Sequence, residues 1–196
     1  IGSRPPIHQS SITASHYALD SHAVRKREEG RVHLDGFLSY PSAVYTVPYG
    51  VMVPKEVGNL LLPVPVSGSH IGFSTLRMEP CWMAMGQAAG IASALSIDGK
   101  VKVQNIDLSR LQDKLVDQKA TLMYFKDVDY TSPHFRMVQY LGLRGYLPEW
   151  TARLQKPVDM ATLTAWKKLS GKDLPGIEAG KTTRLVALEM IYRKIK

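Results

Sequence analysis

The segment "SHIGFSTLRMEPCWMAMGQAAGIASALS", residues 69–96, joins a polar loop to a long apolar run that is rich in Gly and Ala. Pro80 suits the first turn of a helix, where a missing N–H costs no hydrogen bond. We therefore expect a helix that runs to about Ile97, with Gly99 as its C-cap. Small side chains along a helix give up packing area, so something is expected to approach its backbone closely.

The sequence before this helix is typical of strands. Residues 37–54, "FLSYPSAVYTVPYGVMVP", and residues 59–66, "NLLLPVPV", combine β-branched, aromatic and apolar side chains with prolines at turn positions. The second run is almost continuously apolar, which suits a strand buried on both faces, as in a parallel sheet. A strand, a loop and a helix in succession predict an α+β or partial α/β fold.

The sequence after this unit predicts further helices. Residues 105–120 have Asp107 as a candidate N-cap, with apolar positions on one face behind it. Ser132 precedes another helical pattern, and the segments 160–171 and 181–196 form a weak internal repeat that ends in basic residues. We therefore divide the chain into a domain of residues 1–125 and a small helical module of residues 126–196.

Composition narrows the classes of function. The net charge is +8, but Lys and Arg are scattered and are not interleaved with aromatic residues, which argues against a nucleic-acid partner. No apolar run reaches the roughly 20 residues that span a bilayer. One cysteine rules out an internal disulfide and a cysteine-based zinc site.

The opening "IGSRPPIHQ" lacks Met and a signal peptide, so we expect a fragment. Its localisation stays unknown, with the periplasm and the cell exterior both open.

The residue types of the segment 67–93 allow two interpretations equally well. The segment could bind a ligand, or its small residues could serve close helix packing alone. A loop of small residues before a helix N-terminus suits an anionic or electron-rich ligand, and Arg77 adds a fixed cation. The small residues suit tight helix packing just as well. His70 in this loop is a candidate hydrogen-bonding or acid–base group. Cys81 has no neighbouring His or second Cys in the sequence, so we interpret it as a small buried apolar residue.

Residues 16–22, "HYALDSH", contain a possible metal trio of His16, Asp20 and His22. No single helix or strand would present all three together, so no metal site is expected. His22 could transfer a proton, because an ordinary histidine titrates near neutrality, although a surface histidine beside a turn is the commoner case.

Residues 47–95 resemble the C-terminal part of a bacterial family of FAD-dependent oxidoreductases, and the resemblance extends over about residues 15–122. Residues 17–22, "YALDSH", resemble the Asp-Ser-His segment of that family. One position departs from the family pattern, because Gly50 replaces the arginine that follows Pro-Tyr. The matching residues are Pro48, Tyr49, Pro54, Lys55, Asn59, Leu60, Leu61, Ser67, Ser69, His70, Arg77, Pro80, Met83, Gly86, Gln87, Ala88 and Ala89.

The resemblance implies the C-terminal strand–loop–helix part of a Rossmann-type FAD-binding oxidoreductase, with FAD as cofactor. The residues implied at the flavin are Ser67, Gly68, His70, Arg77, Met78 and Glu79, and the implied catalytic residues near the substrate are His22 and His70. The chain contains no G-x-G-x-x-G motif, which normally cradles the pyrophosphate. The expected partners are therefore a missing N-terminal FAD-binding half and a small-molecule or saccharide-like substrate. The fragment alone is expected neither to retain FAD nor to be active.

The tail is similar to a different kind of module. Residues 125–148 resemble the opening of S-layer-homology modules, and residues 182–195 resemble their closing helix. The alternative functions are a non-catalytic cell-surface or polysaccharide-associated module, or part of a polysaccharide-processing enzyme with His22 as its acid–base group. No evident pair of carboxylates supports the last alternative.

Overall fold

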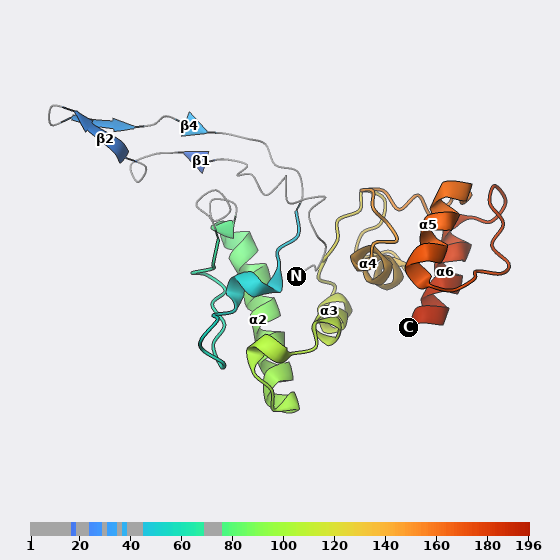
Figure 1. The fold of residues 1–196 in the computed structure, drawn as a ribbon, viewed down its shortest axis with the longest axis horizontal. Coiled ribbons are helices and arrows are strands. Elements are labelled where there is room, and N and C mark those ends of the chain that lie inside the picture. The colour runs from blue at the N-terminus through green and yellow to red at the C-terminus, as the bar shows by residue number, and fades with distance from the viewer. Residues whose placement is uncertain (1–16, 19–23, 29–30, 35–36, 39–44, 69–75) are drawn as a thin grey trace. The chain divides into compact units, whose positions relative to one another are not determined.

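The computed structural model describes residues 17–18, 24–28, 31–34, 37–38, 45–68 and 76–196. The chain forms two compact units, which divide between Leu111 and Gln112 within one helix (Figure 1). The functional boundary between residues 125 and 126 stays a prediction.

The described strands are short and lie near the start of the chain. Strand β1, Tyr17–Ala18, pairs antiparallel with β4, Phe37–Leu38. Strand β2, Val24–Glu28, pairs antiparallel with β3, Arg31–Leu34. Each pair is a separate two-stranded sheet.

The predicted α+β or partial α/β fold is wrong for the described residues, because the described segments 45–68 and 76–196 contain helices and loops without a strand. Residues 45–54 instead include the short 3-10 helix η2, Tyr49–Met52. The expected strand at 59–66 is irregular. The N–H groups of Leu62 and Ser67 donate to carbonyls in η2, at 2.8 Å each. Pro63 and Pro65 lie between these two donors and have no N–H to extend a ladder.

The predicted central helix is confirmed as α2, Glu79–Gly99. Its first turn contains Pro80, as expected. Its C-cap is Lys100 rather than Gly99, and Lys100 adopts a left-handed φ of 50°. The buried stripe of α2 consists of Met85, Ala88, Ala89, Ala92 and Leu95.

The segment around η2 packs against a second short helix, η3, Val103–Asn105. The buried hydroxyl of Tyr49 donates to the carbonyl of Val103 at 2.9 Å. The side-chain amide of Gln104 donates to the carbonyls of Pro54 and Val57, each at 2.9 Å. These bonds tie the irregular segment 49–57 to the chain that follows α2.

Helix α3, Leu108–Asp117, begins where the sequence predicts. The carboxylate of Asp107 accepts hydrogen bonds from the N–H groups of Ser109 and Arg110, at 2.8 and 3.3 Å, and so caps the helix. Leu111 and Leu115 are buried as expected, whereas Leu108 is 40% exposed.

The C-terminal unit contains the three further predicted helices, α4 (Phe135–Leu143), α5 (Met160–Ser170) and α6 (Arg184–Ile195). Asp159 caps α5 and Thr183 caps α6 through their side-chain oxygens. The core of the unit is apolar and includes Phe135, Val138, Leu141, Leu147, Val158, Trp166, Leu188 and Ile191.

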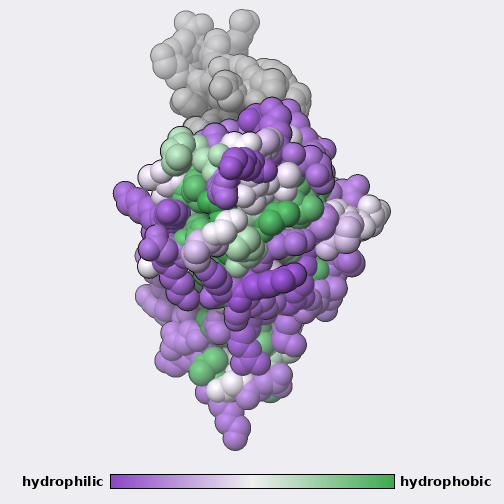
Figure 2. Space-filling view, turned by 90° about the vertical axis from the view of Figure 1, so that its right-hand side faces the viewer, coloured by the Kyte–Doolittle hydropathy of each residue, from purple (hydrophilic) through white to green (hydrophobic). Residues whose placement is uncertain are grey.

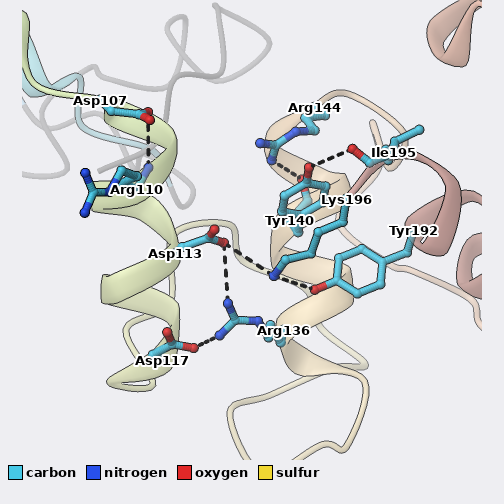
Figure 3. A network of polar contacts seen from close by, with 10 residues as sticks. All are labelled: Asp107, Arg110, Asp113, Asp117, Arg136, Tyr140, Arg144, Tyr192, Ile195 and Lys196. Atoms are coloured by element: carbon cyan, nitrogen blue, oxygen red, sulfur yellow. Dashed lines mark hydrogen bonds and ion pairs between the residues drawn. The ribbon is translucent and has the colours of Figure 1, made fainter.

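Polar contacts join the ends of α3 and α6 and tie both to α4, where the hydroxyl of Tyr140 donates to the carbonyl of Ile195 at 3.5 Å (Figure 3). The guanidinium of Arg136 on α4 forms ion pairs with Asp113 and Asp117 on α3. The ammonium of Lys196, beyond α6, lies 3.1 Å from the hydroxyl of Tyr192 and 4.0 Å from the carboxylate of Asp113. Such half-exposed pairs orient helices but add little stability.

Candidate functional site

The residues predicted to face the flavin lie before and at the start of α2, but only some of them are described. His22 and His70 lie outside the described residues. Ser67 and Gly68 are exposed, and the N–H of Ser67 donates to the carbonyl of Val51 at 2.8 Å. This main-chain bond fixes where the loop before α2 begins.

Arg77, Met78 and Glu79 form the approach to α2, and all three are exposed. Met78 is the N-cap, and its side chain makes no capping hydrogen bond. The site therefore offers a cation, an apolar side chain and a carboxylate at the positive end of a long helix.

The first turn of α2 offers fewer backbone donors than a helix N-terminus usually does. Pro80 has no N–H, and the N–H groups of Cys81 and Trp82 both donate to the carbonyl of Met78, at 2.9 and 3.1 Å. Among the described residues nothing accepts from Glu79, so its N–H is the donor that remains. One donor beside a carboxylate is a poor cradle for a pyrophosphate.

A donor that the sequence did not single out lies in the same turn. The indole Nε1 of Trp82 is shielded from solvent and has no hydrogen-bond partner in the described part of the chain. Buried Trp N–H groups nearly always find a partner. Only burial identifies this atom, because Trp82 reads in the sequence as one apolar helix residue among many.

The thiol of Cys81 is half-buried and shares a hydrogen bond with the hydroxyl of Tyr45. Burial raises the pKa of Cys81, and the bond from Tyr45 lowers it only in part. The pKa of Tyr45 is raised to about 12, first by burial and then by Cys81. Both groups therefore stay protonated near neutral pH, so the thiol of Cys81 is unreactive. The prediction of a small buried apolar residue holds only in part, because Cys81 is half-buried and hydrogen-bonded.

Within the described part of the chain, nothing covers one side of the small-residue face of α2, which we call its bare face. A Cβ at Gly86 or Gly90 would meet no atom of the described structure within 4 Å. On the same side, Met83 is 74% exposed and Ile97 is 76% exposed. The predicted tight packing therefore holds for the buried stripe of α2, while the glycines face open space.

The part of the chain that the structure describes contains neither a candidate metal site nor a candidate membrane-spanning helix. No group of three or more His, Cys, Asp and Glu side chains there could hold a metal ion. None of the helices described has both the length and the apolar character needed to span a membrane.

Comparison with known proteins gives one match. The sequence model of the family described as FAD dependent oxidoreductase matches residues 5–115, which is more than half of the chain. The protein belongs to this family. No curated protein and no solved structure matches the chain.

The name of this FAD-dependent oxidoreductase family implies FAD in its members. The described residues fit one part of that cofactor better than the other. Arg77 and the indole N–H of Trp82, which has no partner among the described residues, suit the carbonyl oxygens of a flavin ring. The first turn of α2 does not suit the diphosphate, and the described residues contain no Rossmann fold.

Proposed function

We propose that the N-terminal unit of this FAD-dependent oxidoreductase forms the flavin-ring side of the active site. The proposed flavin contacts are Ser67, Gly68, His70, Arg77, Met78 and Glu79. His22 and His70 are proposed to lie near a small-molecule or saccharide-like substrate. When bound, FAD would supply the hydride or electron transfer, and these residues would position the substrate and cofactor.

The observation that carries this proposal is the bare face of α2. Only Glu79 and Asp98 are charged along its 21 residues, so the helix is apolar nearly all round. Such a helix is normally buried on every side. Met83, Gly90 and Ile97 nevertheless face open space within the described structure. We infer that the diphosphate-binding half of the FAD site packs on this face and supplies the donors that α2 lacks.

Native purification with a matched pair of variants tests the proposal. Arg77→Met should lower the flavin content of the protein, because it removes the exposed cation before α2. Arg110→Met is the control, since Arg110 is an exposed arginine on the outside of α3. The measurement is the visible flavin absorbance per polypeptide. Each variant is purified together with the diphosphate-binding half, because the chain alone is not expected to retain flavin. Equal flavin content in the two variants under these conditions would contradict the proposal.

A further inference from the structure

A hollow of about 410 Å³ lies wholly within the C-terminal unit, outside the part that matches the family. One wall is the segment that leads into α4, and the other is the turn 153–156. Val128 and Leu154, both buried, supply apolar lining. The face on the side of α5 and α6 is mainly hydrophilic, with an apolar area in the upper half of the view (Figure 2).

The charged groups in the lining leave a small positive excess. Arg153 and Lys156 are cationic, and Asp127 is the one carboxylate among the lining residues. Both oxygens of Asp127 already accept backbone hydrogen bonds, from Ala152 at 2.8 Å and from Arg153 at 2.7 Å. The side chain of Lys156 is exposed and has no ion-pair partner among residues 112–196, all of which are described.

The main chain at Arg153 has an unusual conformation that hydrogen bonds to Asp127 hold in place. Its φ of 51° lies in the left-handed region, which a residue with a Cβ rarely adopts. The two bonds to Asp127 hold that conformation. The guanidinium pairs with Glu149 at 2.9 Å through one nitrogen, which leaves its other N–H groups for a ligand. Ser132 accepts from the N–H of His134 at 3.2 Å, so its own O–H can also donate.

We propose that this hollow binds a small organic monocarboxylate. Donors surround an apolar lining, which suits an organic acceptor better than a bare inorganic anion. The lining carries two cations and one carboxylate, and Glu149 beside it already pairs with Arg153. This balance suits at most a single negative charge, because Asp127 and Glu149 would both repel a dianionic phosphate. A carboxylate also matches the planar fork of an arginine. The proposal is independent of the flavin site.

The test is a titration of the full 196-residue chain, followed by the NMR shifts of its backbone amides. The probes are butyrate, its uncharged isostere butyramide, and inorganic phosphate. We expect butyrate to shift the amides of residues 127–134 and 153–156, and to bind more tightly than either other probe. Equal binding of butyramide, tighter binding of phosphate, or shifts confined to other residues would overturn the proposal.

Three variants sharpen the result. Lys156→Met should weaken butyrate binding about three- to tenfold, because it removes a charge-assisted hydrogen bond. Glu149→Gln should strengthen binding, because Glu149 competes for Arg153. Lys181→Met is the control, since Lys181 pairs with Glu178 and does not line the hollow. Unchanged binding in both Lys156→Met and Glu149→Gln, with thermal unfolding as in the wild type, would overturn the assignment.

Two further carboxylates identify the source of the ligand. Glucuronate represents a sugar acid and N-acetylalanine represents a peptide C-terminus. Whichever binds more tightly in the hollow names the source, and failure of both to outbind butyramide would overturn the proposal.

Discussion

Gly90 in α2 and Gly142 in α4 both lie inside helices, where glycine normally costs stability relative to alanine. Their surroundings differ. A Cβ at Gly142 would lie 3.0 Å from the ring of Phe125, whereas a Cβ at Gly90 would meet nothing within 4 Å in the described structure. Close packing against Phe125 therefore explains why position 142 has no side chain, and the described structure gives no such reason at position 90.

Alanine at the two positions should have opposite effects. Gly142→Ala should lower the free energy of unfolding by about 1–3 kcal/mol, because the Phe125 ring is buried and cannot move freely. Gly90→Ala should raise it by up to about 1 kcal/mol through helix propensity. Denaturant unfolding of the full chain measures both. A loss of stability in Gly90→Ala would mean that the face of α2 is already covered within this chain.

Gln139 on α4 is a second residue whose role depends on burial. It is fully buried, and its Oε1 accepts from the N–H groups of Leu122 and Met123 at 2.8 Å each. Gln139→Leu should therefore cost about 2–4 kcal/mol of unfolding free energy, because two buried donors lose their acceptor. The exposed Gln155→Leu is the control for the same change in side chain. Similar unfolding midpoints for the two variants would contradict this role.

At the scale of elements, the capping carboxylate of Asp159 makes α5 sensitive to pH. Its pKa is lowered, first by the hydrogen bond from the N–H of Thr162 and then by that from the Thr162 hydroxyl. The folded state therefore prefers the ionised form. This stabilisation is present above the unfolded pKa of the carboxyl group and is lost as pH falls through its folded pKa.

Removing this cap should have an effect that depends on pH. Asp159→Ala should lower the melting temperature at neutral pH, and the difference from wild type should shrink as the solution is acidified. Asp173→Ala is the control, because the Asp173 side chain is 95% exposed and caps no helix. Thermal unfolding followed by circular dichroism across the acid range measures both. A difference that stays constant into acid would show that the charge of Asp159 is not responsible.

The helices were predictable because their signals are local. A cap residue followed by apolar positions at helical spacing identified α3, the weak repeat of segments 160–171 and 181–196 indicated α5 and α6, and Pro80 marked the first turn of α2. The strand prediction for residues 59–66 was wrong because a run of apolar and β-branched residues indicates a buried segment as readily as a segment paired with another strand. A strand also needs a partner with free N–H and C=O groups, which Pro63 and Pro65 cannot extend.

For the whole molecule, the bare face of α2 is where assembly should be decided. The double variant Met83→Gln, Ile97→Gln should leave the unfolding of the chain nearly unchanged, since both side chains are about three-quarters exposed. It should nevertheless reduce the flavin content of the protein when it is purified together with the diphosphate-binding half. Met160→Gln is the control, because Met160 is 66% exposed in the C-terminal unit. Undiminished flavin in the double variant would rule out this face as the contact.

The candidate site was predictable only in part. Arg77, Met78 and Glu79 could be placed around the start of the helix from the sequence and from the family resemblance, and the structure finds them exposed there, with Glu79 as the first residue of α2. The shielded indole of Trp82, without a partner in the part of the chain that the structure describes, could not be foreseen, and neither could the bond between Tyr45 and Cys81. Both depend on which atoms are shielded from water, and that is not a property of neighbouring residues in the sequence.

The sequence by itself determined the approximate positions of the helices, the N-cap of α3 and the membership of the FAD-dependent oxidoreductase family, because these depend on residue types at short, regular spacings. Only the tertiary structure decided which face of α2 is buried, why Gly142 is needed, and how Asp127 fixes the turn at Arg153. Each of these brings together residues from separate segments of the chain, and only folding sets which of their atoms lose contact with water.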